Sequence, residues 1–257
     1  MKKLQALIFD VDGTLADTER DGHRPAFNAA FAAAGLPWRW DEKLYGELLA
    51  VTGGKERMRY FCQRSDPDFL RRADADAVIR DLHAAKTEHY LAMLDRGEIP
   101  LRPGVARLLG EARAAGVRLA IATTTTPENV TRLLRSTLGA DSPSWFEVIG
   151  AGDVVAAKKP AADIYHWVLQ RLQLPAAGCL ALEDSANGLI AARGAGLATV
   201  VTDNDYTLDH DFAAACSHLS DLGEPHSPCR IRRGDMHGGA CVDLDLLRRW
   251  HADYHKQ

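Results

Sequence analysis

The stretch FDVDGT, residues 9–14, places two aspartates two residues apart directly after the apolar run of residues 4–9. A short run of branched apolar residues bounded by Asp and Gly is typical of a strand that is buried on both faces of a parallel sheet. In an open parallel sheet the reactive groups lie in the crevice at the carboxyl ends of the strands. We therefore expect Asp10 at such a strand end and Asp12 in the loop that follows it.

Apolar runs of the same kind recur along the chain, and helical patterns that end near Gly or Pro lie between them. Strands are expected at residues 4–9, 117–122, 146–150, 179–182 and 197–201. Helices are expected at residues 105–115, 127–138, 161–172 and 186–195, with a terminal helix at 243–255. The alternation predicts an α/β fold with a Rossmann-like parallel sheet built from βαβ units.

Residues 18–100 interrupt this alternation, because they are rich in alanine, show helical periodicity and contain no comparable strand run. Helices are expected at residues 23–34, 41–49, 55–63 and 76–95, and Gly97 would end the last of them in the C′ position. We predict an α-helical cap domain at 18–100, inserted into a discontinuous α/β core domain at 1–17 and 101–257. The two connections between these domains would form a double hinge.

Composition and charge argue against several classes of partner. The 257 residues carry a formal net charge of −4 with both signs interspersed, which is not typical of a nucleic-acid or membrane surface. No segment approaches the roughly 20 apolar residues of a membrane span. The five cysteines are scattered without CxxC spacing, which indicates reduced thiols rather than disulfides or a zinc site. We expect a cytoplasmic protein with no nucleic-acid or membrane partner, and a monomer with an oligomer as the alternative.

Four predicted strand ends carry chemically active side chains, in the order acid, hydroxyl, lysine and acid pair. The threonine run 123–126 precedes Pro127 and would cap a helix, but its hydroxyls and N–H groups also suit phosphate oxygens. A lysine before Pro160 would bring a cation to the same edge, and Glu183 with Asp184 forms a second acidic pair. Carboxylates this close repel each other unless one pKa rises or a divalent cation binds. Taken one by one, these features are also typical of helix caps and solvated loops.

Together these residues resemble the four ordered motifs of the haloacid-dehalogenase-like phosphohydrolases, in the subclass with a helical cap. The matching segments are FDVDGTL at 9–15, the hydroxyl of Thr123, Lys159-Pro160 and LEDSANG at 182–188. The resemblance spans roughly residues 4–201 and implies a phosphohydrolase that works through an aspartyl phosphate. Asp10 would be the nucleophile, Asp12 the general acid and base, Thr123 a phosphate ligand and Lys159 the cation that neutralises charge.

The resemblance also implies Mg²⁺ as the cofactor. Its ligands would be the carboxylates of Asp10 and Asp184 and the backbone carbonyl of Asp12, with Glu183 as a direct or water-bridged partner. Mg²⁺ prefers hard oxygen ligands and keeps several waters, so this set suffices and no His or Cys is needed. Lys159 would offset the negative charge of the carboxylates and of the transferred phosphoryl group.

The predicted cap domain contains a segment that suits a second phosphate. The sequence GGKER at 53–57 opens a predicted helix with free N–H groups, and its Lys55 and Arg57 add positive charge. A helix start with exposed basic residues is the alternative. Glu19 and His23 follow the first hinge and could meet sugar hydroxyls, or they are only a helix-start acid and a surface histidine.

The segments at 18–31 and 44–57 and the TTTTP turn at 123–127 look like those of the CbbY branch of the family. That resemblance implies a sugar-bisphosphate phosphatase, most specifically one that removes the C1 phosphate of xylulose 1,5-bisphosphate, an inhibitor of Rubisco. The residues that would bind the substrate are Glu19, His23, Tyr45, Thr52, Gly53, Gly54, Lys55, Arg57, Thr123, Thr124 and Lys159. Asp21 and Gly22, between Arg20 and His23, differ from the pattern of some relatives at this point, and this difference affects the position expected for His23.

Three other functions fit parts of the pattern. A β-phosphoglucomutase shares the core and the cap, and would return the phosphoryl group to another sugar hydroxyl. A phosphoglycolate phosphatase would not need a basic site for a second phosphate. A receiver-type signalling module also uses Asp, Mg²⁺, Thr and Lys on a parallel sheet, but the insert and the paired aspartates argue against it.

Overall fold

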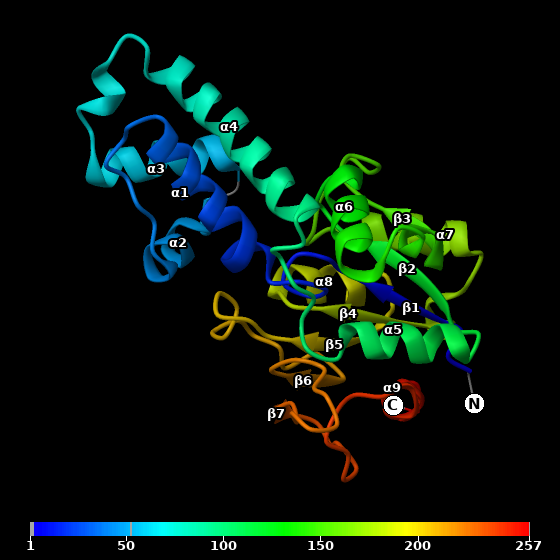
Figure 1. Cartoon of the computed structure of the whole chain (residues 1–257). Coiled ribbons are helices and arrows are strands. Elements are labelled where there is room, and N and C mark those ends of the chain that lie inside the picture. Colours follow the sequence, from blue (N-terminus) through cyan, green and yellow to red (C-terminus); the bar gives the residue numbers. More distant parts are fainter. Residues whose placement is uncertain (1–2, 52, 257) are drawn as a thin grey trace. The chain divides into compact units, whose positions relative to one another are not determined.

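The computed structural model describes residues 3–51 and 53–256, and Figure 1 traces the chain by element. The chain divides into two compact units, Met1–Asp17 together with Pro100–Gln257, and Thr18–Ile99. The strands of the described chain all belong to the larger unit, whereas the described elements of the smaller unit are helices. The predicted α/β fold with a parallel sheet is confirmed.

The sheet has seven strands in the order β3-β2-β1-β4-β5-β6-β7, and neighbouring strands run parallel except for β6 and β7. Their bounds are β1 Ala6–Phe9, β2 Arg118–Ala122, β3 Phe146–Gly150, β4 Cys179–Glu183, β5 Ala198–Thr202, β6 Ser217–Leu219 and β7 Ile231–Arg233. The strand order reverses between β1 and β4, so the carboxyl end of β1 lies at the topological switch point of the sheet. The five strands expected from apolar runs are confirmed, and β6 and β7 lie where no strand is predicted.

Five longer helices accompany the sheet in the described part of this unit. They are α5 Val105–Ala114, α6 Pro127–Leu138, α7 Asp163–Leu172, α8 Ala186–Gly194 and α9 Leu244–Tyr254, with 3₁₀ turns η3 Ser142–Trp145 and η4 Ala176–Gly178. The side chain of Thr126 accepts the N–H of Asn129 at the start of α6, and that of Ser185 accepts the N–H of Gly188 at the start of α8. The predicted helices are confirmed, with their ends shifted by no more than two residues.

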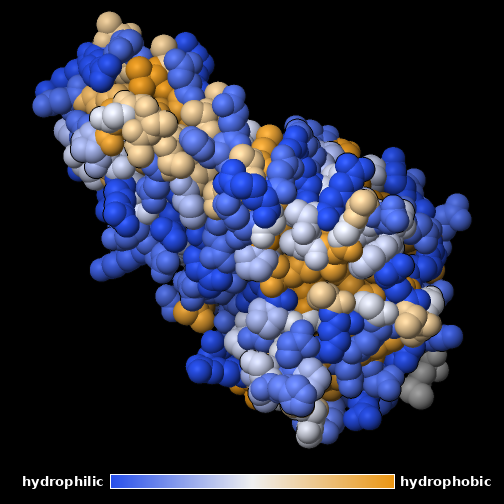
Figure 2. Space-filling view, in the orientation of Figure 1, coloured by the Kyte–Doolittle hydropathy of each residue, from blue (hydrophilic) through white to orange (hydrophobic). Residues whose placement is uncertain are grey.

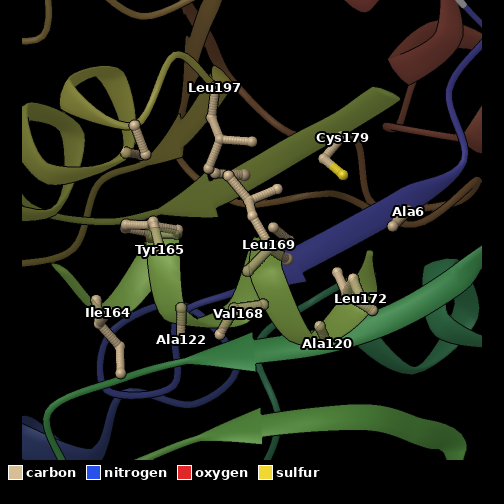
Figure 3. Close-up of a cluster of buried hydrophobic side chains, with 14 of the residues drawn as sticks. Ala6, Ala120, Ala122, Ile164, Tyr165, Val168, Leu169, Leu172, Cys179 and Leu197 are labelled. Atoms are coloured by element: carbon tan, nitrogen blue, oxygen red, sulfur yellow. The ribbon is translucent and has the colours of Figure 1, made fainter. Parts of the chain in front are cut away.

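Small residues on the strands make room for large ones on α7 (Figure 3). Ala6 of β1 and Ala120 of β2 are fully buried, and so are Tyr165 and Val168 of α7, all in one apolar cluster. Burying an aliphatic side chain such as valine contributes about 1.5 to 3 kcal/mol relative to leaving it exposed. This packing fixes α7 against the sheet, and it therefore anchors the loop of residues 151–162 that leads into α7.

The smaller unit packs helices around aromatic side chains. Its elements are η1 Glu19–His23, a π-helix, then α1 Arg24–Ala33, α2 Glu42–Leu48, α3 Gly54–Ser65, the 3₁₀ turn η2 Phe69–Arg71 and α4 Ala75–Asp95. The ring centroids of Phe27 and Trp40 lie 4.7 Å apart, and those of Phe31 and Trp40 lie 4.9 Å apart. Gly97 has a φ of 67° just after α4, as expected of a C′ glycine. The π-helix extends the predicted helix 23–34 toward its N-terminus.

Hydrophilic residues cover most of the face that Figure 2 shows, and apolar residues gather in a few places between them. In the part of the chain that the structure describes, the exposed large apolar side chains are Val154, Ile190, Leu208 and Ile231. None of the described helices combines the length and the apolar character that a bilayer crossing requires. The five cysteines are free thiols, as the sequence predicts.

Arg102 connects two segments of the larger unit: the one where the chain leaves this unit, at Asp17, and the one where the chain returns to it, at Pro100. It is buried, and its Nε lies 3.1 Å from Oδ1 of Asp17. Its guanidinium also donates to backbone oxygens of Gly13, Thr202, Asp203 and Ser220. A buried charge is stable only when it is paired and its donors are satisfied. One side chain therefore ties together stretches that are distant in the sequence.

Replacing Arg102 with Met is expected to lower the free energy of unfolding by about 3 to 5 kcal/mol, because the change removes a buried ionic partner and the donors to several carbonyls. Chemical denaturation followed by circular dichroism measures the loss. Arg96→Met is the control, since Arg96 pairs with Glu98 on the surface, where ion pairs contribute little. Equal stability of the two variants would contradict the structural role of Arg102.

Candidate active site

Side chains that are far apart in the sequence meet at the carboxyl ends of the central strands. Asp10 follows β1, Glu183 is the last residue of β4 and Asp184 comes next. Lys159 lies in the loop between β3 and α7. The N–H of Asp10 donates to the carbonyl of Leu182 at 3.0 Å, which continues the pairing of β1 with β4 up to the reactive edge. The parallel sheet thus brings the two acidic segments side by side.

Lys159 forms ion pairs with two of these carboxylates. Its Nζ lies 2.6 Å from Oδ1 of Asp10 and 2.6 Å from Oε1 of Glu183. Tyr165 of α7 donates its hydroxyl to the same oxygen of Glu183. Burial alone would lower the pKa of Lys159, but the charges of Asp10 and Glu183 outweigh burial and raise that pKa above its usual value. Lys159 is therefore a cation at neutral pH.

The acidic side chains of this cluster suit a metal ion. Asp10, Glu183 and Asp184 are buried, and each offers a carboxylate oxygen within 4.8 Å of the others. Burial raises the pKa of Glu183 to about 7, although Lys159 opposes the shift, and burial with the charges of Asp10 and Glu183 raises the pKa of Asp184 well above its ordinary value. With all three carboxylates ionised, the cluster would carry excess negative charge beside the ammonium of Lys159. A divalent cation with oxygen ligands would offset that charge.

The loop after β1 needs a glycine at position 13. Gly13 has a φ of 85°, and its N–H donates to the carbonyl of Ala16 at 2.8 Å. A Cβ on Gly13 would lie 2.2 Å from Oδ2 of Asp184, which is closer than any real contact. Asp12 precedes this turn and is partly exposed. The glycine therefore lets the loop that carries Asp12 pack directly against Asp184.

Thr123 lies one residue beyond β2, at the same edge of the sheet as Asp10. It is buried, and its Oγ1 accepts the N–H of Thr125 at 3.3 Å. Thr124 is exposed. The structure thus brings Asp10, Lys159, Glu183 and Asp184 close together, and it places Thr123 at the same edge of the sheet.

Three of the predicted substrate-binding residues form a chain of contacts within the smaller unit. Tyr45 donates its hydroxyl to Oε2 of Glu19, and Nη1 of Arg57 donates to the Tyr45 hydroxyl at 2.9 Å. The Arg57 Nη1 also lies 4.0 Å from Glu19 Oε2. Arg57 is buried, so its charge is held by these two neighbours rather than presented as a mobile surface charge.

His23 contacts a lysine that sequence reasoning missed. Nζ of Lys86 lies 2.8 Å from Nδ1 of His23, and the His23 ring stacks on Tyr90 with 3.9 Å between centroids. Burial and the nearby charges of Lys86 and Arg57 lower the pKa of His23 well below its ordinary value, so the imidazole is neutral at pH 7. Lys86 lies on the buried stripe of α4 between Leu82 and Tyr90. A lysine at an apolar position of a helical pattern is the signal that could have identified it.

The glycine-rich segment lies at the start of α3. Gly53 has a φ of 94° and is exposed, and Gly54 is the first residue of the helix. A Cβ on Gly54 would lie 2.7 Å from Cδ2 of His83, so glycine permits a close contact there. Lys55 is partly exposed. Thr52, also predicted to bind substrate, lies outside the described residues.

Two residues of the larger unit contact the acidic cluster although sequence reasoning did not select them. Tyr165 binds Glu183 from α7, and Asn204 donates its Nδ2 to Oδ2 of Asp184 at 2.8 Å. Asn204 follows the end of β5, the neighbour of β4. The sequence signal that points to Asn204 is a polar residue just past the end of a predicted strand, because parallel strands bring their carboxyl ends to one edge of the sheet.

Comparisons with known proteins identify the family. The family model of the haloacid dehalogenase-like hydrolases matches residues 4–196. The chain is 51% identical over 249 residues to the plasmid protein CbbY of Cupriavidus necator, covering 96% of this chain and 97% of that one. It is 52% identical over 220 residues to CbbY of Rhodobacter capsulatus, covering 86% of this chain and 94% of that one.

Solved structures give the same result. The crystal structure of CbbY from Rhodobacter sphaeroides in complex with phosphate is 48% identical and has a TM-score of 0.72, covering 86% of this chain and 96% of that one. A mutant of the same protein in complex with xylulose-(1,5)bisphosphate has a TM-score of 0.73, with the same identity and coverage. The family match covers more than half of this chain. The alignments with the relatives named above cover nearly the full length of those proteins. The chain therefore belongs to the haloacid dehalogenase-like hydrolases, and within that family it is a phosphatase.

Proposed function

We propose that this phosphatase hydrolyses small sugar bisphosphates through an aspartyl phosphate on Asp10, with the C1 phosphate of xylulose 1,5-bisphosphate as its preferred target. The observation that carries the proposal is the buried contact of Lys159 with both Asp10 and Glu183, beside Asp184. The complex of the CbbY relative with xylulose-(1,5)bisphosphate supports the choice of substrate.

The first step transfers the phosphoryl group to the enzyme. A carboxylate oxygen of Asp10 forms a bond to phosphorus while the bond from phosphorus to the sugar oxygen breaks, and Asp12 donates a proton to that leaving oxygen. Lys159 keeps one oxygen of Asp10 in place and offsets the charge of the phosphoryl oxygens. Thr123 is assigned to bind one of those oxygens.

The second step regenerates the enzyme. Asp12, now a carboxylate, removes a proton from water as the water oxygen bonds to phosphorus, and the bond between phosphorus and Asp10 breaks. Inorganic phosphate leaves and Asp12 is protonated again. Because Asp12 gives a proton in one step and takes one in the other, a single residue serves both halves of the reaction.

We assign Mg²⁺ to the acidic cluster, with the carboxylates of Asp10 and Asp184 and the backbone carbonyl of Asp12 as ligands and Glu183 as a direct or water-bridged partner. The bound ion would neutralise charge on the phosphate oxygens and align them with Asp10. The three buried carboxylates beside the ammonium of Lys159 support this assignment. Chelation of Mg²⁺ is expected to stop turnover.

We assign substrate selection to the smaller unit. Gly53, Gly54 and Lys55 at the N-terminus of α3 would bind the phosphate that is not cleaved, with Arg57 nearby. Glu19, His23 and Tyr45 would meet the sugar hydroxyls. The contact of His23 with the buried Lys86 supports this assignment, because it holds a positive charge next to a residue of the proposed site.

Replacing Lys55 with Ala is expected to reduce the preference for bisphosphates over monophosphates by about tenfold or more, since a hydrogen bond to a charged group is worth about 1.5 to 3 kcal/mol. The measurement is phosphate release with Mg²⁺ from a panel of pentulose and hexose mono- and bisphosphates. Lys43→Ala, which removes an exposed lysine of the same unit, is the control. Unchanged selectivity of the Lys55→Ala variant would contradict the proposal that Lys55 binds the second phosphate.

The same panel tests the reaction itself. Wild-type enzyme is expected to release inorganic phosphate from xylulose 1,5-bisphosphate faster than from monophosphates. Accumulation of an isomerised monophosphate without phosphate release would identify a mutase instead. Release from phosphoglycolate at a rate above that of all sugar bisphosphates would contradict the proposed substrate class.

A further inference from the structure

We propose that Asn204 is a positioning residue that orients the carboxylate of Asp184 for Mg²⁺, an inference that rests on the proposed function. Asn204 lies two residues beyond β5, and its Nδ2 donates to Oδ2 of Asp184 at 2.8 Å. This hydrogen bond engages one oxygen of Asp184 and leaves the other for the cation. Asn204 belongs to none of the segments that carry Asp10, Lys159 or Asp184.

The amide of Asn204 is held so that its NH₂ group, and not its oxygen, faces Asp184. Its Oδ1 accepts the N–H of Tyr206 at 2.9 Å, and its own N–H donates to Oγ1 of Thr207 at 3.0 Å. A flipped amide would place a donor against the Tyr206 N–H and an acceptor against a carboxylate, and both contacts would be repulsive. The turn of residues 204–207 therefore fixes the direction of donation to Asp184.

The hydrogen bond between Asn204 and Asp184 also lies where three strand ends meet. A Cβ on Gly13 would lie 2.2 Å from Oδ2 of Asp184 and 2.6 Å from Nδ2 of Asn204. The loop after β1 thus packs directly on this hydrogen bond. Arg102 donates to the backbone oxygens of Gly13 and Asp203, the residue before Asn204, so one side chain holds both loops.

A carboxylate that ligates a metal is usually held by hydrogen bonds of this kind, and their removal typically costs about 10- to 100-fold in metal affinity or activity. Asn204→Ala is therefore expected to weaken Mg²⁺ binding by about 10- to 100-fold. We expect kcat at subsaturating Mg²⁺ to fall while KM for the sugar bisphosphate changes little, because the contacts of Asn204 are to Asp184 and to its own turn and not to a residue proposed to bind the sugar.

The test measures Mg²⁺ binding to the full chain without substrate, by isothermal titration calorimetry and by the rise in melting temperature on adding Mg²⁺. The variants are Asn204→Ala and Asn204→Leu, the second of which fills the same space without a donor. Asp209→Ala, a change at an exposed residue of the same loop, is the control and should bind Mg²⁺ as the wild type does.

Weaker Mg²⁺ binding by both Asn204 variants, with metal-free melting temperatures near that of the wild type, would support the inference. Unchanged Mg²⁺ affinity would overturn it and leave the proposed function intact. A lower metal-free melting temperature with unchanged affinity would likewise overturn it, since Asn204 would then only stabilise its loop. Failure of the wild type to bind Mg²⁺ would overturn the proposed function and this inference together.

Discussion

Replacing Asp10 with Asn is expected to abolish phosphate release, with a loss in kcat of at least about 10⁴-fold, because the amide has no anionic oxygen to attack phosphorus. The change also removes the ion pair in which Oδ1 of Asp10 lies 2.6 Å from Nζ of Lys159. Steady-state phosphate release with saturating Mg²⁺ and sugar bisphosphate measures the effect.

The control for this prediction is Asp153→Asn, the same chemical change at a side chain that is 99% exposed. That variant should retain wild-type turnover. Circular dichroism must show that the Asp10 variant is folded. A folded Asp10→Asn variant with turnover close to that of the wild type would contradict the assignment of the nucleophile.

Replacing Asp12 with Asn is expected to slow turnover by about 10² to 10⁴-fold, the usual contribution of general acid and base catalysis. The loss should be smaller for an aryl phosphate with an acidic leaving group, because that leaving group needs no proton in the first step. Rapid-quench kinetics of the two steps checks this difference. Equal losses in the first step for alkyl and aryl phosphates would contradict the role of Asp12 as the acid.

The central part of the fold could be predicted because its strands are buried on both faces. β1, β2, β4 and β5 are almost wholly apolar, and each ends at a polar residue or a turn, so that their positions are evident in the sequence. β7 contains Ile231 followed by two arginines and is exposed along its length. A three-residue edge strand of this kind has no apolar pattern, and only its pairing with β6 defines it.

The acidic cluster could be predicted because parallel strands bring their carboxyl ends to one edge. Asp10 and Asp184 directly follow strands that pair with each other, so the position of each residue in the sequence implies its place in space. Asn204, Tyr165 and Lys86 contact site residues through loops and helix faces instead. Their contacts depend on tertiary packing, which leaves only weak signals in a single sequence.

The central claim is that Asp10 carries the phosphoryl group between the two steps. The most direct measurement is mass spectrometry of the Asp12→Asn variant after incubation with Mg²⁺ and an aryl phosphate, whose acidic leaving group needs no proton in the first step, followed by a rapid acid quench. Slow hydrolysis in this variant should let the phosphoenzyme accumulate, with the phosphoryl group on the peptide that contains Asp10. A phosphoryl group on any other residue, or continued turnover without a phosphoenzyme at any time point, would contradict the account.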